Sequence, residues 1–384
     1  MKISFFSNYL THHQIPFCLE MQKRGDVEFY FVSTEPMEED RKQGGWEFNE
    51  EYPFEIKAYL SEKEKEESLK LARESDVIII GSAPEEYVTH RMKYAKSKLT
   101  LRYSERIYKR GRWRALSPRG LAKRVKTYFR YLGKPLYMLC ASAYTAGDLA
   151  LLGSYLGKCF KWGYFPKTYQ YEIENLIQDK EENSLLWVAR MIDWKHPEIP
   201  VLVAKRLKER GFQFRLRMIG VGPLLEDVQK MVQEYNLHDC VQLIGSMSPE
   251  EVRGYMEKSN IFLFTSDQQE GWGAVLNEAM NSGCVVVANG QIGAVPFLLK
   301  NNQNGSIYYG NDVEKITEIV EKFLNNKELA VEFGRKAYET IIHQWSAQVA
   351  ADRLVATCKK LLDGKKEFFK DGPCSKASII VKKE

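Results

Sequence analysis

Two glutamates lie eight positions apart in the stretch TSDQQEGWGAVLNEAMNSGCVVVANG, residues 265–290. Glu270 follows an apolar, strand-like run and precedes Gly271 and Gly273, whereas Glu278 lies within a helix-like pattern. A carboxylate accepts hydrogen bonds from pairs of hydroxyl groups. Glycines and free N–H groups at the start of a helix admit an anion such as a diphosphate. The stretch therefore predicts a site that holds both ends of an activated sugar donor.

A structural explanation of the same residues stays open. Glu270 could only stabilise the positive end of the helix, and Glu278 could be a solvated helix residue. The segment WVARMIDWKHP, residues 187–197, favours chemistry, because Arg190 follows a strand and Lys195 comes five positions later. Two fixed cations would stabilise a departing diphosphate. The alternative is that both are ordinary surface residues, as most long cationic side chains are.

Two glycine turns follow other strands of the same half. Gly220 and Gly222 in MIGVGPLLEDV lie between a strand and a helix, where glycines often only make the turn. Gly245 in LIGSMSPEEV follows the next strand. We expect Gly222 to line the donor site, and the backbone of Ser246 and Met247 to face a nucleobase edge.

Parallel βα units are predicted to position these residues, because short β-branched or aromatic runs alternate with longer helical patterns. The expected strands are KISFFS, VEFYFVS, DVIIIG, PLYMLCAS, KCFKWGYF, SLLWVARM, FRLRMIGVG, VQLIGSM, NIFLFTSD, CVVVANG and GSIYYG. The carboxyl ends of parallel strands share the edge at which open α/β sheets bind ligands. The glutamates, the cations and the glycine turns should therefore meet there.

A chain of 384 residues favours two domains. We expect an N-terminal domain over residues 1–168 and a C-terminal domain over 180–345, both α/β and doubly wound, with a polar linker at 166–183. Residues 346–384 are expected to form a helix and a tail that return to the N-terminal domain. The seven cysteines are scattered, which argues against a disulfide framework or a zinc site.

The ordered series VARMIDWK, MIGVGP, LIGSMSPEEV and EGWGAVLNEAMNSGCVVVANG resembles the retaining glycosyltransferases of family 4. These enzymes carry the glycosyl transferase group 1 domain, and similar members build bacterial capsular and surface polysaccharides. The resemblance covers residues 184–345. It implies the GT-B fold, two Rossmann-like domains facing a cleft. It also implies a retaining hexosyltransferase without cofactor or essential metal, whose donor is a UDP- or GDP-linked sugar.

By this resemblance, Arg190 and Lys195 hold the donor diphosphate, Glu270 the hydroxyls of the transferred sugar, and Glu278 the ribose. The backbone that contacts sugar and phosphate would be that of Gly271, Gly273, Ala274 and Val275. The segment NGQIGAVPFLL lacks a glutamate that the family usually has there, which leaves the nucleotide open. The implied mechanism is front-face substitution, in which the departing diphosphate takes the proton of the incoming hydroxyl.

The acceptor is expected on the N-terminal domain. Asn8, His12 and His13 follow its first strand, and similar surface-polysaccharide enzymes have such a loop, which implies contact with acceptor or donor phosphate. The alternative is that either histidine caps a helix or lies exposed. Glu105 and Ser142 follow later strands and are assigned to the acceptor side.

The strongest compositional anomaly is the segment 91–134, with 16 Lys or Arg and one acid, a net charge of 16 − 1 = +15. The remaining chain carries 5 − 15 = −10. A helical stripe is formed by Leu121, Val125, Tyr128, Phe129 and Leu132, flanked by Lys123, Arg124, Lys126 and Arg130. A basic amphipathic helix is typical of an anionic membrane surface. Equally, the stripe could pack on the core while the cations are solvated.

These observations predict transfer of a sugar to a glycan linked to a polyprenyl diphosphate, by a peripheral enzyme at the cytoplasmic face of the cell membrane. We expect no secretory signal, and no span at 135–157, because Asp148 interrupts it. One alternative is a nucleotide-sugar epimerase or a phosphorylase of the same fold. Another is a nucleic-acid-binding protein that uses residues 91–134, although the ordered motifs favour a partner other than nucleic acid.

Overall fold

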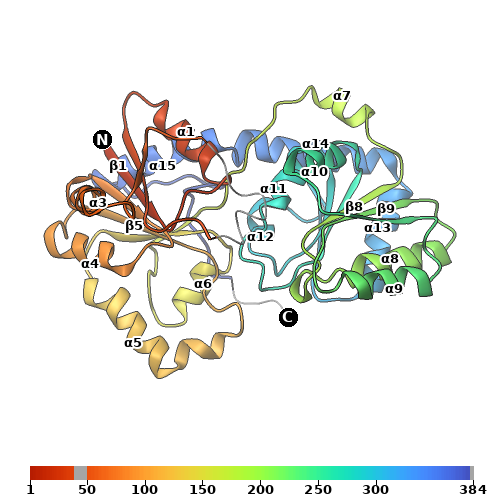
Figure 1. Cartoon of the computed structure of the whole chain (residues 1–384), viewed down its shortest axis with the longest axis horizontal. Coiled ribbons are helices and arrows are strands. Elements are labelled where there is room, and N and C mark those ends of the chain that lie inside the picture. The colour runs from red at the N-terminus through yellow and green to blue at the C-terminus, as the bar shows by residue number, and fades with distance from the viewer. Residues whose placement is uncertain (39–49, 381–384) are drawn as a thin grey trace. The chain divides into compact units, whose positions relative to one another are not determined.

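The computed structural model describes residues 1–38 and 50–380, and the chain divides into two compact units. Unit 1 contains Met1–Lys167 and the C-terminal segment that starts at Ser346, and unit 2 is Thr168–Trp345. Each unit is built on one open parallel sheet with helices around it (Figure 1). The predicted α/β class with two Rossmann-like domains is confirmed.

The sheet of unit 1 has the strand order β3-β2-β1-β4-β5-β6-β7. Its strands are β1 (Lys2–Ser7), β2 (Glu28–Ser33), β3 (Glu55–Lys57), β4 (Val77–Ile80), β5 (Leu99–Ser104), β6 (Leu136–Cys140) and β7 (Cys159–Lys161). The order reverses between β1 and β4, which pair directly. The list of expected strands omitted β3 and β5, because two of the three residues of β3 are charged and β5 lies inside the basic segment.

The helices of unit 1 are α1 (Ile15–Gln22), α3 (Glu62–Glu74), α4 (Glu85–Tyr94), α5 (Pro118–Thr127), α6 (Thr145–Ala150) and α15 (Ala347–Leu362). Short 3₁₀ turns, η2 (Arg112–Leu116) and η3 (Phe129–Tyr131), flank α5. Helix α15 packs against α1, so residues 346–380 belong to this unit. Ser117 caps α5 by accepting a hydrogen bond from the N–H of Gly120.

The sheet of unit 2 has the order β10-β9-β8-β11-β12-β13. Its strands are β8 (Ser184–Val188), β9 (Arg215–Ile219), β10 (Val241–Gly245), β11 (Ile261–Phe264), β12 (Val285–Asn289) and β13 (Ser306–Tyr308). All six coincide with strands expected from the sequence. The order reverses between β8 and β11, which are neighbours.

Helices cover both faces of this second sheet, with α8, α9 and α13 on one side and α10, α11 and α14 on the other (Figure 1). The bounds are α7 (Ile173–Gln178), η4 (Asp193–Lys195), α8 (Glu198–Glu209), α9 (Leu225–Glu234), α10 (Pro249–Lys258), α11 (Val275–Asn281), α12 (Val295–Leu298), α13 (Val313–Leu324) and α14 (Lys327–Gln344). The expected linker at 166–183 contains α7, whose Leu176 is buried.

Some cations of the basic segment are buried, although both interpretations of its sequence placed them at the surface. Arg91 is fully buried and donates hydrogen bonds to the backbone carbonyls of Ala72 (3.0 Å), Ser75 (2.7 Å) and Leu99 (2.9 Å). Arg106 and Arg124 are buried as well. Part of the positive charge therefore serves the packing of unit 1.

The apolar stripe of this segment is divided too. Tyr128 is buried and Phe129 is half-buried, whereas Leu121, Val125 and Leu132 are exposed. The stripe is therefore partly packed on the core and partly exposed to solvent. Across residues 1–38 and 50–380, no helix combines the length and the apolar character that crossing a bilayer requires.

Candidate active site

Lys195 and Glu270 form an ion pair in unit 2. Lys195 ends the turn η4 that follows β8, and Glu270 lies in the loop after β11. Their side chains are only 15% and 14% exposed, and the Glu270 carboxylate also accepts a hydrogen bond from Ser266 Oγ at 3.2 Å. Because β8 and β11 are the strands between which the order reverses, the pair lies where open α/β sheets bind ligands.

Thr265 ties the two loops together beneath this pair. Its hydroxyl donates to the carbonyl of Lys195 at 2.7 Å and accepts a hydrogen bond from Trp187 Nε1 at 2.9 Å. The backbone N–H of Asp267 donates to the carbonyl of Trp194 at 2.9 Å. These contacts join the loop after β8 to the loop after β11, and they hold together the two loops that carry the ion pair.

His196 supports the same arrangement in a left-handed backbone conformation, with φ of 50°. The carboxylates of Asp267, 3.7 Å from Nε2, and of Glu198, 2.8 Å from Nδ1, raise the pKa of His196 to about 9. Sequence reasoning missed Thr265, Asp267 and His196. Their positions in the sequence could have indicated them. His196 directly follows Lys195 in DWKHP, and Thr265 and Asp267 lie in TSD, at the start of the glutamate loop.

The turn glycines after β9 are needed by the backbone. Gly220 and Gly222 have φ of 137° and 158°, and a Cβ on either would overlap a carbonyl oxygen of the β8 loop, that of Ala189 or Met191. The N–H of Gly220 donates to the carbonyl of Gly245 at 2.7 Å. Beyond that residue, Ser246 is exposed and Met247 is half-buried. The predicted donor contacts after β9 and β10 thus lie at the same edge as Lys195.

The loop after Glu270 is anchored by Trp272, which is fully buried and donates from Nε1 to Asn277 Oδ1 at 2.9 Å. Gly273 has φ of 85°, and a Cβ there would overlap the Phe264 ring. The N–H of Gly293 donates to the carbonyl of Glu270 at 3.2 Å, which joins the segment after β12 to this loop.

Helix α11 begins at Val275, and no side chain caps it within the part of the chain that the structure describes. Within the same residues, the N–H groups of Gly273, Ala274 and Val275 have no acceptor. They are the donors available to an anionic ligand, whereas Gly271 is buried.

Glu278 lies in α11 and is half-buried, and no hydrogen bond or ion pair of its carboxylate occurs in residues 1–38 and 50–380. Burial raises the pKa of Glu278, while the charge of Arg253 opposes that shift. The Arg253 guanidinium donates instead to the backbone carbonyl of Glu278 at 3.0 Å. A half-buried carboxylate without a partner differs from the solvated helix residue that was the alternative.

Arg190 lies just beyond β8 and is exposed. Among the described residues its guanidinium forms no ion pair, and no contact joins it to Glu270 or Glu278. The structure therefore brings Lys195 and Glu270 into direct contact, and leaves Arg190 and Glu278 at the same sheet edge without contact to that pair.

The residues assigned to the acceptor follow strands of unit 1. Asn8 accepts a hydrogen bond from Ser7 Oγ at 3.1 Å. The rings of His12 and His13 lie 3.7 Å apart, and His13 stacks on Tyr164 at 5.8 Å. His12, His13 and Asn8 are all half-buried.

Tyr164 links this loop to Glu105. Its hydroxyl donates to Glu105 Oε1 at 2.5 Å, and Lys109 Nζ donates to Oε2 at 2.7 Å. The structure thus brings together His13 and Glu105, which the sequence assigned separately, through Tyr164. Sequence reasoning missed Tyr164 and Lys109. The only signal was the aromatic cluster WGYF at the end of an expected strand.

Ser142 is fully buried, and its Oγ accepts a hydrogen bond from the N–H of Tyr144 at 3.3 Å. Its hydroxyl therefore contacts its own turn. Nearby, the buried Asp148 accepts hydrogen bonds from the N–H groups of Ile107 (3.0 Å) and Tyr108 (3.1 Å). Asp148 fixes the loop that carries Glu105.

Residues 170–340 match the family model "Glycosyl transferases group 1". This part of the chain is similar to the glycosyl transferases group 1 family, and the motifs described above lie within it. The match includes Lys195, Glu270 and Glu278.

Curated relatives are similar over part of the chain. WcaL of Escherichia coli, named for colanic acid biosynthesis, is 28% identical over 46% of this chain and 45% of its own length. AmsK of Erwinia amylovora, an amylovoran biosynthesis glycosyltransferase, is 27% identical over 42% of this chain and 40% of its own. The chain thus spans less than half the length of these curated relatives.

Solved structures are similar over nearly the whole chain. TarM of Staphylococcus aureus superposes with a TM-score of 0.66 at 14% identity, covering 92% of this chain and 98% of TarM. HepE of Anabaena, in complex with UDP, has the same TM-score and identity and covers 94% of this chain and 100% of HepE. At such identity the likeness shows the fold, which is GT-B.

Proposed function

We propose that the protein is a retaining hexosyltransferase of family 4, which transfers a sugar from a nucleotide-diphosphate donor to a glycan. The observation that carries the proposal is the Lys195–Glu270 ion pair at the strand-order reversal of unit 2. It places one cation and one carboxylate side by side, largely removed from water, at the ligand-binding edge of a group 1 domain.

The two charges have complementary tasks when a donor binds. Without donor, Lys195 and Glu270 neutralise each other. A diphosphate competes for Lys195, and the hydroxyls of the transferred sugar take the place of the ammonium group on the Glu270 carboxylate. The N–H groups of Gly273, Ala274 and Val275 add donors for the phosphate, and Glu278 accepts the ribose hydroxyls. Arg190 supplies the second cation.

Transfer then breaks the bond between the anomeric carbon and the diphosphate oxygen. The acceptor hydroxyl attacks from the same face and passes its proton to the departing diphosphate, so configuration is retained. Lys195 and Arg190 stabilise the negative charge that develops on the leaving group. This step uses neither a cofactor nor an essential metal ion.

UDP- and GDP-sugars are the proposed donors. The support is that HepE was solved with UDP and that a relative in Mycobacterium tuberculosis, 24% identical over 180 residues, is named a GDP-mannose-dependent mannosyltransferase. The proposed acceptor is a glycan on a polyprenyl diphosphate for surface polysaccharide synthesis, handled by unit 1 at the cytoplasmic face of the cell membrane. The names of WcaL and AmsK support the polysaccharide context.

A thermal-shift screen with UDP-, GDP- and ADP-sugars tests the proposal, on the wild type and on Glu270→Ala and Arg190→Ala. We expect one class of donor to raise the Tm of the wild type, and both variants to lose that shift. Glu226→Ala, which changes an exposed glutamate of α9, is the matched control and should retain it. Turnover of a donor without acceptor would instead favour an epimerase, and dependence on phosphate a phosphorylase. The proposal fails if no donor stabilises the wild type.

A further inference from the structure

Helix α5 buries a charged residue and exposes apolar ones, whereas an ordinary surface helix does the opposite. Its one buried residue is Arg124, whose Nη2 donates to the Tyr108 hydroxyl at 3.4 Å. Leu121 and Val125, one turn apart on the helix, are 46% and 56% exposed. A helix that packs on a core turns its apolar residues inward, so these two are left for something other than the core of unit 1.

Two more apolar side chains extend the exposed area at both ends of α5. Trp113 in η2 is 69% exposed, and Leu132, directly after η3, is 59% exposed. Both 3₁₀ turns pack against α5. We call Trp113, Leu121, Val125 and Leu132, with the cations among them, the α5 face. Single exposed apolar residues are common, but a group of four on neighbouring turns indicates an interaction surface.

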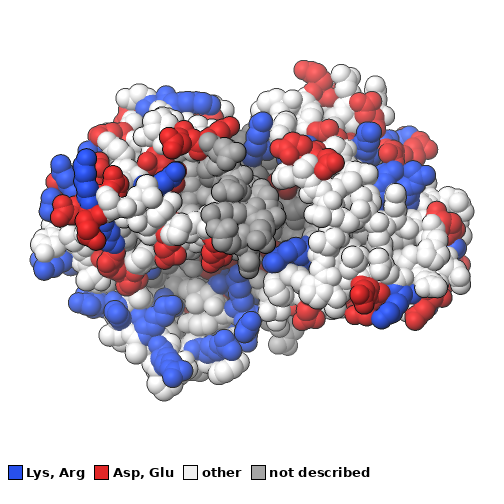
Figure 2. All heavy atoms as spheres, in the orientation of Figure 1, with Lys and Arg blue, Asp and Glu red and all other residues white. Residues whose placement is uncertain are grey.

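The cations of the α5 face lack acidic partners. They are Arg110, Arg114, Arg119, Lys123, Lys126, Arg130 and Lys134. None of them forms an ion pair within residues 1–38 and 50–380, and residues 106–134 contain neither Asp nor Glu. Elsewhere in unit 1, cations such as Lys161 pair with carboxylates, here Asp371 at 2.6 Å. Figure 2 shows Lys and Arg gathered over α5.

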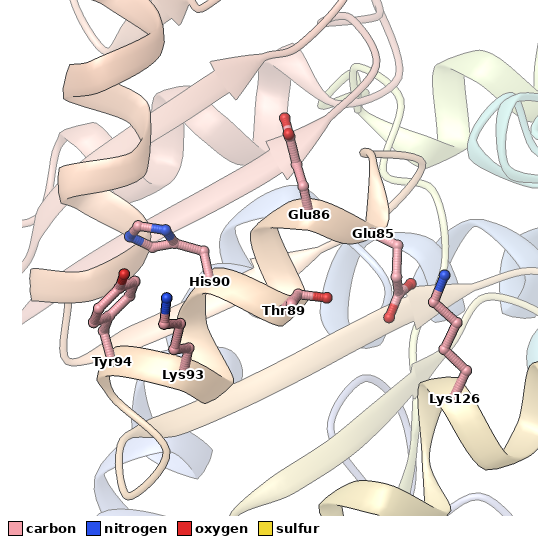
Figure 3. Close-up of a pocket in the computed structure, with 7 residues that line it drawn as sticks. All are labelled: Glu85, Glu86, Thr89, His90, Lys93, Tyr94 and Lys126. Atoms are coloured by element: carbon pink, nitrogen blue, oxygen red, sulfur yellow. The ribbon is translucent and has the colours of Figure 1, made fainter.

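A groove of about 460 Å³ lies between α4 and α5 beside this face (Figure 3). Its lining residues are Glu85, Glu86, Thr89, His90, Lys93, Tyr94 and Lys126. Both acids are already paired, Glu85 with Arg102 at 3.1 Å and Glu86 with Lys65. Lys93 and Lys126 keep their charge available, so the groove suits an anionic group.

We propose that the α5 face docks on an anionic lipid bilayer. Trp113, Leu121, Val125 and Leu132 enter the boundary between headgroups and acyl chains, and the surrounding lysines and arginines contact lipid phosphates. Exposed aliphatic side chains favour a bilayer over a nucleic acid, whose phosphates need only the cations. Each cation close to an anionic leaflet strengthens binding by roughly fivefold. This proposal goes beyond glycosyl transfer, because none of these residues belongs to the donor site.

Flotation with vesicles tests the docking surface without any donor. The probes are vesicles of phosphatidylcholine alone and of phosphatidylcholine mixed with phosphatidylglycerol. We expect the wild type to float with the anionic vesicles, less so as salt rises, and to remain unbound with the neutral ones. The double variants Leu121→Glu/Val125→Glu and Lys123→Gln/Lys126→Gln should each weaken binding by roughly tenfold or more.

Leu60→Glu is the matched control, because Leu60 is 65% exposed in unit 1 but lies outside the α5 face. It should float like the wild type. All variants change exposed side chains, so their Tm and any donor-induced shift should match the wild type, which separates this proposal from that of the donor site. Equal binding to neutral vesicles, an equal loss in Leu60→Glu, or salt-sensitive binding to RNA without flotation would each overturn it.

Discussion

Lys195 and Glu270 are 75 residues apart in the chain and form an ion pair, because the strands that precede them are neighbours in the sheet. The pair joins opposite charges that are largely removed from water. In the proposed function, the diphosphate and the sugar hydroxyls of the donor are the alternative partners of these side chains. An exposed pair of this kind would contribute little to stability. Because the pair lies at the ligand-binding edge of the sheet, we propose that a bound donor separates the two side chains.

Lys195→Met should remove the cation and keep most of the side-chain volume. We expect kcat/KM to fall by roughly 10²–10³-fold, as for other lost charge-stabilising groups, with the fold intact. Lys195→Arg should restore part of the rate. Steady-state kinetics with the donor found in the screen measures both. Lys205→Met, at a half-buried lysine of α8, should leave the rate unchanged. If Lys195→Met also kept the wild-type rate, Lys195 would have no part in the mechanism.

Glu278→Gln separates donor affinity from stability. Because burial raises the pKa of Glu278, the folded state disfavours its charged form, and this cost is present above the ordinary pKa of a carboxyl group and absent at low pH. The neutral variant should therefore melt higher than the wild type at neutral pH. Its donor Kd should rise by roughly 10-fold, since one ribose acceptor weakens.

Calorimetric titration and thermal melts measure these two effects on the same samples. Glu226→Gln on α9 should change neither. A Glu278→Gln protein with unchanged donor affinity would mean that this glutamate does not hold the ribose.

His196 should make stability depend on pH. Its carboxylate partners raise its pKa from 6.5 to about 9, so the folded state binds the proton more tightly than the unfolded state. The resulting stability is fully present below pH 6.5 and is lost as pH rises through 9. We expect about 2 kcal/mol between these limits after allowance for partial exposure. Urea unfolding across this range should show a flatter profile for His196→Gln, and identical profiles would contradict the assignment.

The sheet of unit 2 could be predicted strand by strand because each of its strands is a short, mainly apolar run followed within two residues by glycine or a polar residue. The edge at which the site residues gather follows from that parallel order alone. The partners of those residues could not be predicted. That Lys195 contacts Glu270, while Arg190 remains exposed, depends on how η4 turns after β8, and the positive φ of His196 sets this turn.

In the basic segment, the sequence did not predict which residues are buried and which are exposed. Its net charge was evident from the sequence. However, Arg91 is buried and Leu121 is exposed, which is the opposite of what their polarity suggests. Arg91 is buried because five backbone carbonyls and the Thr100 hydroxyl accept its hydrogen bonds, and these come from residues 72–76 and 99–100. Periodicity along one helix carries no information about such acceptors. It therefore cannot show which face of α5 is turned outward.

Gly273→Ala should destabilise the glutamate loop. The residue has φ of 85°, and its new methyl group would overlap the Phe264 ring, which is buried at the end of β11. We expect a loss of about 2–3 kcal/mol in the free energy of unfolding, from backbone strain and overpacking together. Gly254→Ala in α10 is the matched control, because a methyl group there meets open space in an ordinary helix. It should gain about 0.5–1 kcal/mol. Chemical denaturation measures the free energy of unfolding of both variants. If Gly273→Ala were as stable as Gly254→Ala, the conformation of this loop would not require glycine.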